Sequence, residues 1–414
     1  MSAIPTLAYL TDDLPGIGGR IKARLEDFLV EEMPAYEPAG EGEHLMLFVE
    51  KRQLATTDVA RRLSRDFAVP RNDVGYAGLK DKQAITRQHF TVRLTQGRRE
   101  PAAAIARVNE HPRIDVLWAE PHRNKLHRGH LAGNRFVIRV REVEPTAVIA
   151  AKRVLDRLLQ RGTPNYVGEQ RFGYRANNDA IARHLLRGRH QQALDEMLGR
   201  PLEIESEALR AGREAYDRGD YAAALTHWPR HLRYDRQALD ALRQGRSPAD
   251  AVAAIDRTQR QFLISALQSA IFNRVLDRRL RAGTFDRLLV GDVAYKHATG
   301  AMFLVDADAA EADNAPDGRV ARCEVSPTGP MWGPKMLRPT DEPARLEAEV
   351  LGAFELDEHD LDGAAEGTRR PLRIALHNAD ISGGVDEHGA YVRLAFELPR
   401  GGFATMALRE IMKA

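Results

Sequence analysis

Alternating apolar and polar side chains predict β-strands near both ends of the chain. Apolar and polar residues alternate over 88–94, which is the two-residue period of a strand with one buried face. The same alternation recurs over 24–32, 135–143 and 391–398. We therefore expect these four segments to be strands of a largely antiparallel sheet.

Apolar side chains spaced four residues apart predict helices between the strands. Such a spacing runs over 59–67 and predicts a helix there. The polar run that begins at Thr56 offers an N-cap for this helix, and Pro70 would end it. Residues 145–160 have helical composition, and Gly162 is suited to terminate a helix there. The first third of the chain is therefore predicted to mix helices and strands.

The middle of the chain has a different character. Residues 177–282 are dense in Ala, Leu and Arg and predict a mostly helical region. Within it, one long helix is expected to have a buried stripe of Phe262, Leu263, Ala266, Ala270 and Ile271. Residues 306–320 are acidic and rich in turn formers, which predicts a loop, and 343–367 predict an acidic helix with a linker. A closing helix is expected over 405–412. Strands, then helices, then strands indicate an α+β fold whose core is interrupted by a helix-rich insertion.

Charge is segregated along the chain, although the formal net charge is only +2. Residues 1–50 carry 3 basic and 10 acidic side chains, whereas residues 51–141 carry 20 basic and 8 acidic ones. Residues 301–414 are again acidic, with 12 basic and 21 acidic side chains. A basic segment between acidic ends is typical of a polyanion-binding protein, but solvated helix faces would give the same counts.

Composition and missing motifs exclude several classes of protein. A single cysteine, Cys323, excludes an internal disulfide and a cysteine-based metal cluster, and it fits the reducing cytoplasm. The longest run without charge, 261–273, is shorter than the ~20 residues of a membrane-spanning helix. The first residues lack the pattern of a secretory signal. Without a phosphate-binding loop, a serine-hydrolase elbow or a zinc-protease pair, we expect neither a metal nor a nucleotide cofactor.

Residues 74–86 form the first candidate for chemistry. Asp81 is a single carboxylate between Lys80 and Lys82, directly after a glycine-rich stretch. Neighbouring positive charge favours an ionised carboxylate, and small residues let a ligand approach the backbone closely. A turn with solvated charges is the alternative interpretation.

Residues 124–136 form the second candidate. Basic residues, two glycines, Asn134 and Phe136 are interleaved here, a mixture suited to phosphate contacts together with stacking of an unpaired base. Phe136 could equally be a core aromatic, because it shares a strand face with Ile138 and Val140. Asn134 could be an ordinary residue at the start of a strand.

Three further segments carry local patterns without chemistry of their own. Residues 163–173 lie where the helical region begins and could serve only as a hinge. Residues 326–333 and 399–405 are rich in turn formers and predict ordered loops.

Together these segments resemble the TruD family of pseudouridine synthases. In that family the aspartate after Leu-Lys is the catalytic residue, which corresponds to Asp81. Two departures are His127, where the motif has arginine, and Val167, where an aromatic residue is more usual. The resemblance extends from Lys22 to Glu410, and the matching segments are GYAGLKDKQAITRQHF, KLHRGHLAGNRF, PNYVGEQRFG, SALQSAIFNRVLDRRL, SPTGPMWG and LPRGGFATMALRE.

The resemblance implies two domains and a substrate. A pseudouridine synthase catalytic domain with a mixed, largely antiparallel sheet would comprise residues 1–163 and 368–414, and residues 164–367 would form the TruD insertion domain. The substrate would be transfer RNA, at the uridine of position 13 in the D-arm. We expect a cytoplasmic monomer without an obligate protein partner or a membrane association, and a reaction without cofactor.

The resemblance also implies roles for individual residues. Lys22 resembles the basic partner of the catalytic carboxylate, and Lys80 would support the site. The apolar lining would come from Phe28 and Phe403. Phe136 would stack on the extruded uracil, and Asn134 would hold the site in shape. Basic residues near the motifs are expected to contact the RNA, namely Lys82, Arg87, Lys125, Arg128, Arg135 and Arg171.

Two functions of other classes fit parts of this pattern. The basic middle alone would suffice for a non-catalytic RNA-binding or RNA-chaperone protein. An enzyme resembling nucleoside hydrolases would act on free uridine and show little dependence on salt.

Overall fold

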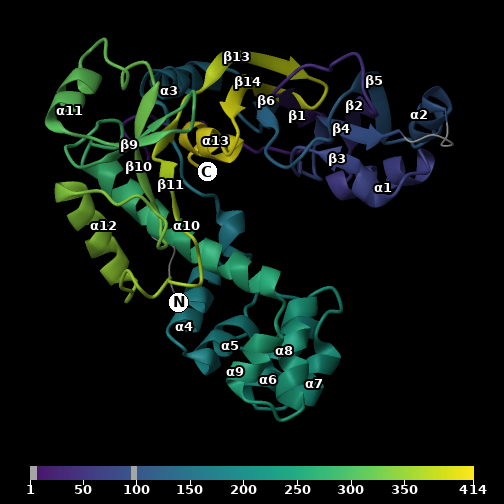
Figure 1. Ribbon diagram of the computed structural model, residues 1–414, viewed down its shortest axis with the longest axis vertical. Coiled ribbons are helices and arrows are strands. Elements are labelled where there is room, and N and C mark those ends of the chain that lie inside the picture. The colour runs from purple at the N-terminus through teal and green to yellow at the C-terminus, as the bar shows by residue number, and fades with distance from the viewer. Residues whose placement is uncertain (1–6, 95–99) are drawn as a thin grey trace. The chain divides into compact units, whose positions relative to one another are not determined.

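The computed structural model describes residues 7–94 and 100–414. The chain divides into two compact units (Figure 1). The sheet unit consists of residues 10–163 and 374–414, and the helical unit of residues 7–9 and 164–373. This division differs from the expected one at two places. Residues 7–9 group with the helical unit, and the chain returns to the sheet unit after Arg373.

One mixed sheet is the core of the sheet unit. Its strand order is β13-β14-β6-β1-β4-β2-β5, with β3 paired to β4. The β1–β4 pair is parallel, and the other strand pairs of this sheet are antiparallel. The predicted α+β class is therefore confirmed. The strands are β1 (Phe28–Pro34), β2 (His44–Arg52), β3 (Val74–Tyr76), β4 (Ile85–Arg93), β5 (Ile114–His122), β6 (Leu131–Arg141), β13 (His377–Asp386) and β14 (Gly389–Pro399).

Helices pack against this sheet. In Figure 1, α1 lies beside β3 and α2 beside β5. Leu63 of α1 is buried against a cluster that includes Leu47 and Phe90 of the sheet. The helices are α1 (Thr56–Asp66), α2 (Pro101–Asn109), α3 (Ala147–Arg161) and α13 (Ala404–Met412), with 3₁₀ turns η1 (Leu25–Asp27) and η2 (Arg71–Asp73).

The ends of two helices test the predicted caps. The cap at Thr56 is wrong, because Thr56 is already helical, Ala55 occupies the N-cap position, and the Thr56 hydroxyl bonds elsewhere. The same helix ends before Pro70, where Ala68 turns the chain at φ +53°. Gly162 does end α3, with φ +80°.

The helical unit combines many short helices with a small sheet. Its strands pair in the order β11-β10-β8-β9. The helices are α4 (Asn178–Leu186), α5 (His190–Leu198), α6 (Glu207–Asp217), α7 (Tyr221–His227), α8 (Arg233–Arg243), α9 (Pro248–Ala254), α10 (Arg257–Arg281), α11 (Ala307–Asn314) and α12 (Asp341–Ala353), with η3 (Glu169–Phe172). The strands are β8 (Val293–Lys296), β9 (Met302–Leu304), β10 (Val325–Met331) and β11 (Thr368–Pro371). The chain passes between the units in β7 (Thr163–Pro164) and β12 (Arg373–Ile374).

Three predictions for the helical unit need correction. The loop expected over 306–320 contains α11, because the Asp306 side chain accepts a hydrogen bond from the Ala309 amide and starts a helix. The loop expected at 326–333 is largely the buried strand β10, since its small residues and prolines pack under α10. On α10, Phe262 lies outside the predicted buried stripe and contacts the Arg171 guanidinium. Within the described residues, no helix is both long and apolar enough to span a membrane.

Candidate active site

Asp81 lies in the loop between β3 and β4, where its carboxylate meets Lys22. The Lys22 Nζ atom donates a hydrogen bond to Asp81 Oδ2 at 2.7 Å. The side chain of Asp81 is 48% exposed and that of Lys22 is 24% exposed. The carboxylate is therefore held on one side by a cation and open to a bound molecule on the other.

Local geometry aims Lys22 at Asp81. The backbone of Lys22 has φ +55°, a left-handed conformation that costs a non-glycine residue ~1–2 kcal/mol. The Lys22 ammonium lies 4.4 Å from the centroid of the Phe28 ring, where a cation–π contact favours it. Phe28 itself is buried at the start of β1.

Phe136 lies in the core of the sheet. It pairs in register with Val30 of β1 and Phe396 of β14, and its ring centroid is 5.6 Å from that of Phe396. Only 8% of Phe136 is exposed. The alternative that Phe136 is a core aromatic therefore describes its position in this structure.

Asn134 belongs to a buried polar cluster beside the Asp81 loop. The Lys80 Nζ atom donates to Asn134 Oδ1 at 2.5 Å and lies 2.8 Å from Glu32 Oε2. Glu32 and Asn134 are register partners on β1 and β6. Because the amide oxygen of Asn134 accepts from Lys80, the Nδ2 group of Asn134 is the part of this side chain that can donate a hydrogen bond.

Glu32 is the negative end of this cluster. The His89 amide donates to Glu32 Oε1 at 3.1 Å. Burial acts to raise the pKa of Glu32, but hydrogen bonding from His89 and the charge of Lys80 outweigh it and lower the pKa below its usual value. The ionised Glu32 therefore fixes Lys80 next to Asp81.

Sequence reasoning missed two buried polar residues under the same loop. Lys51 Nζ donates to the carbonyl oxygen of Asp81 at 3.0 Å, and Gln88 Nε2 donates to that of Gly78 at 3.3 Å. Burial lowers the pKa of Lys51 to about 8, although the Asp81 charge acts to raise it. Strand alternation could have found both, since they share faces with the core residues Val49 and Phe90.

The other residues selected from the sequence have varied environments. Phe403, just before α13, is 41% exposed. Lys125 donates to the Asn72 carbonyl. Arg87 is held by Glu31 and Glu50 at 3.1 and 2.9 Å. Arg171 belongs to the helical unit, where it donates to Ser265. The basic candidates that stand exposed on the sheet unit are Lys82, Arg128 and Arg135.

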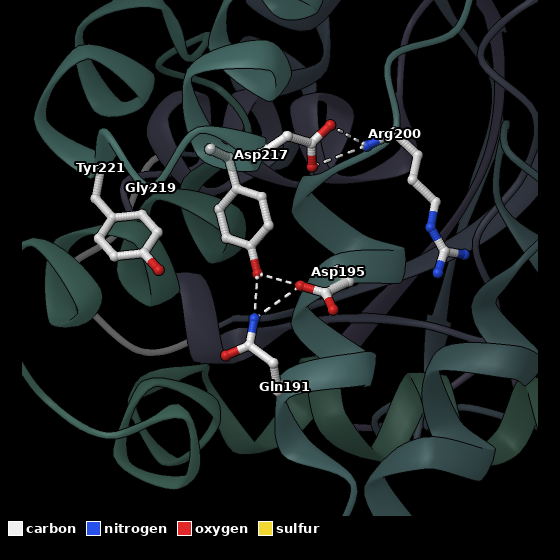
Figure 2. Close-up of a pocket in the computed structure, with 7 residues that line it drawn as sticks. Gln191, Asp195, Arg200, Asp217, Gly219 and Tyr221 are labelled. Carbon is white, nitrogen blue, oxygen red and sulfur yellow. Dashed lines mark hydrogen bonds between the residues drawn. The ribbon is translucent and has the colours of Figure 1, made fainter.

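A cavity of about 370 Å³ lies elsewhere, in the helical unit, between α5, α6 and α7 (Figure 2). The Tyr216 hydroxyl donates to Asp195 at 2.9 Å, and the Gln191 side-chain amide donates to both of these residues. The Asp217 carboxylate accepts from the Arg200 amide. These polar groups satisfy one another, as in a structural cluster. The Asp81 site, with its half-exposed carboxylate held by Lys22, is therefore the better candidate.

Comparison with known proteins identifies the family. The family model described as tRNA pseudouridine synthase D (TruD) matches residues 6–411. A tRNA pseudouridine synthase D from Geobacter sulfurreducens is 44% identical over 412 residues, which are 98% of this chain and 96% of the relative. One from Thermus thermophilus is 36% identical over 405 residues, covering 98% and 92%.

A solved structure agrees with these relatives. A crystal structure from Methanosarcina mazei, described as a tRNA pseudouridine synthase D, superposes with a TM-score of 0.83 at 26% identity. The match covers 99% of this chain and 97% of that one. The resemblance of the sequence motifs is thereby confirmed, and the chain belongs to the tRNA pseudouridine synthase D (TruD) family.

Proposed function

We propose that this protein isomerises uridine to pseudouridine in transfer RNA, at position 13 of the D-arm. The observation that carries the proposal is the half-exposed Asp81 carboxylate, held at 2.7 Å by Lys22. Family membership supports the reaction and the substrate class, and Asp81 would take the role of the aspartate that follows Leu-Lys in the motif that the sequence resembles. Residues 164–367 would be the insertion domain of this family, and they fall within the helical unit.

The reaction breaks one bond and makes another at the same sugar carbon. The bond from C1′ to N1 of uracil breaks, the base rotates, and a bond from C1′ to C5 forms. The proton on C5 leaves, N1 gains a proton, and the product is an isomer of the substrate. Asp81 would act either as a nucleophile on C1′ or as the base that removes the 2′ proton, and it would then assist the proton transfers.

The target uridine must first leave its stack, at a cost of ~a few kcal/mol. The exposed Phe403 ring, the edge of Phe136 and the Nδ2 donor of Asn134 could receive the extruded base. Phe28 and Lys22 would form the wall beside Asp81. A dry wall would keep water from capturing the activated sugar, which would otherwise end as a hydrolysis product.

The exposed side chains of Lys82, Arg128 and Arg135 would meet the phosphate backbone. Arg87 is less suited to this role because two carboxylates already bind it. The groups of this proposed site come from one unit of a single chain, so a monomer in the cytoplasm, where transfer RNA is abundant, would suffice.

Replacing Asp81 by Asn tests the proposal. The carboxamide keeps the shape but can act neither as nucleophile nor as base, so we expect pseudouridine formation to fall by at least ~10²-fold. The measurement is mass-spectrometric mapping of pseudouridine in transfer RNA, with binding followed by filter retention. Asp115→Asn, an exposed carboxylate on β5, is the matched control and should retain full activity.

Three outcomes would contradict the proposal. Retained turnover in Asp81→Asn would remove Asp81 from the chemistry. RNA binding without pseudouridine formation by the wild type would favour a binding protein, and release of uracil from free uridine would favour a hydrolase.

A further inference from the structure

The loop that carries Asp81 is tied to the sheet at three main-chain groups. Gln88 Nε2 donates to the Gly78 carbonyl at 3.3 Å. The Lys80 amide donates to Thr56 Oγ1 at 3.0 Å. Lys51 Nζ donates to the Asp81 carbonyl at 3.0 Å. We refer to Lys51, Thr56 and Gln88 as the loop anchors.

The loop anchors are buried and bonded to one another or to nearby backbone. At most 1% of each of them is exposed. Thr56 Oγ1 donates to Gln88 Oε1 at 2.8 Å, and Lys51 Nζ donates to the Leu54 carbonyl at 2.7 Å. With Oε1 of Gln88 occupied by Thr56, its Nε2 must face the loop. The orientation of each anchor is therefore fixed before any substrate arrives.

The environment of Lys51 argues against a purely stabilising role. The ion pairs found among the described residues do not include Lys51, and burial lowers its pKa to about 8. A buried ammonium without a carboxylate costs free energy, and an apolar side chain of similar length usually stabilises a core better. The Lys51 ammonium instead donates to two carbonyl oxygens, those of Leu54 and Asp81, and so lies directly beside the Asp81 main chain.

The loop anchors add to the hold of the Lys80 side chain, which Glu32 and Asn134 bind, because much of the loop stands in solvent. Leu79 is 65% exposed, and Lys82 and Gln83 are also exposed. Within the described residues, the Asp81 carboxylate is bound by the side chain of Lys22, which is itself partly exposed. A displacement of ~1 Å at a catalytic group can lower a rate by ~10²-fold, so fixing the main chain bears directly on the chemistry.

We propose that Lys51, Thr56 and Gln88 are positioning residues that fix the main chain of residues 78–81 and thereby the Asp81 carboxylate. The inference rests on the proposed function, since it assigns these residues to the same reaction. They act through Asp81 and do not touch the substrate. Their loss should lower kcat while KM for transfer RNA stays nearly constant.

Substitutions at Thr56 give the sharpest test. Thr56→Val keeps the volume and removes the hydroxyl, so we expect kcat to fall by about 10- to 100-fold with KM within about twofold. Thr56→Ser keeps the hydroxyl and should restore kcat to within about threefold of the wild type. Thr86→Val is the matched control, because Thr86 is equally buried and its hydroxyl has no hydrogen-bond partner within the described residues.

Lys51→Met is the second test, because it removes the donor under Asp81 and keeps the length of the side chain. We expect the same fall in kcat at nearly constant KM. Hydrogen exchange of the peptide spanning residues 77–84 should be faster in Thr56→Val and Lys51→Met than in the wild type. Exchange in Thr86→Val should match the wild type.

Several results would overturn the inference. They are equal kcat values for Thr56→Val, Lys51→Met and Thr86→Val, a defect confined to KM, or a loss in Thr56→Ser as large as in Thr56→Val. Circular dichroism will show whether Thr56→Val and Lys51→Met fold. If one of them does not fold, the other variant decides the test. If neither folds, the loop anchors are required for folding, and this result also overturns the inference. A wild type inactive on transfer RNA would refute the proposed function instead, and the exchange measurement would still test the anchors.

Discussion

At the scale of single residues, the site combines charges that are exposed with charges that are buried. Asp81 and Lys22 remain partly open to solvent, whereas Lys51 is fully buried. In the proposed reaction, the exposed pair would exchange water for substrate. The buried ammonium of Lys51 cannot do so. Its burial therefore lowers the free energy of unfolding, and this effect should be measurable as a dependence of stability on pH.

Lys51→Met should reveal this cost. The pKa of Lys51 is about 8 in the folded protein and 10.5 in an unperturbed lysine. Between these values the unfolded chain binds more protons, so the free energy of unfolding of the wild type rises with pH through this window. The wild type should therefore gain about 2 kcal/mol relative to Lys51→Met between pH 7 and 9.5.

The measurement is urea unfolding of both full-length proteins at pH 7, 8 and 9.5. Because the other titrating groups are shared, their contributions cancel in the difference between the two proteins. A difference that stays constant with pH would mean that Lys51 is not a buried ammonium. A neutral amine still donates two hydrogen bonds, so the same titration need not abolish activity.

At the scale of secondary-structure elements, periodic patterns in the sequence predicted helices and strands, but the tertiary contacts between them could not be predicted from the sequence. The alternation over 88–94 predicted β4, and the composition of 145–160 predicted α3. The strand β10 was missed because prolines and glycine resemble a loop when burial under a helix is unknown. For the candidate site, the motifs predicted Asp81 and Asn134. Lys51 joins them only through the fold, which brings its side chain to the carbonyl of a residue 30 positions away in the sequence.

The end of α3 allows a test at this scale. Gly162 adopts φ +80° and ψ 160°, a region that is essentially restricted to glycine. Gly162→Ala should therefore lower the stability of the protein by ~1–3 kcal/mol. Glu142→Gly should have the opposite sign, because Glu142 sits at φ +58° and glycine relieves up to ~1 kcal/mol there.

Thermal melting of the two variants and the wild type checks both predictions, a lower melting temperature for Gly162→Ala and a higher one for Glu142→Gly. The side chain of Glu142 is 67% exposed and its contact with Arg20 is 3.8 Å long, so losing that ion pair should matter little. Equal melting temperatures for Gly162→Ala and the wild type would show that the turn after α3 tolerates a side chain.

At the scale of the whole molecule, the two units differ in charge. The sheet unit carries 31 basic and 26 acidic side chains, whereas the helical unit carries 30 and 33. The excess of positive charge therefore belongs to the unit that contains Asp81. A chain with a net charge of only +2 can still present a cationic unit to a phosphate backbone.

Salt dependence of binding turns this distribution into a prediction. Each phosphate contact contributes about 0.7 to 0.9 to the slope of log affinity against log salt concentration. Lys82→Ala and Arg128→Ala should each reduce the magnitude of that slope by about this amount. Arg87→Ala should leave it unchanged, because Glu31 and Glu50 already neutralise Arg87.

Filter binding of transfer RNA across a salt series measures these slopes. The design separates two explanations of the basic character of residues 51–141. If the positive charge is arranged to meet RNA, the exposed and the neutralised cations must differ, because only an exposed cation can release counterions from the phosphates. Equal slopes for Lys82→Ala, Arg87→Ala and the wild type would mean that this charge serves the protein's own ion pairs, and the RNA would then have to bind through other residues.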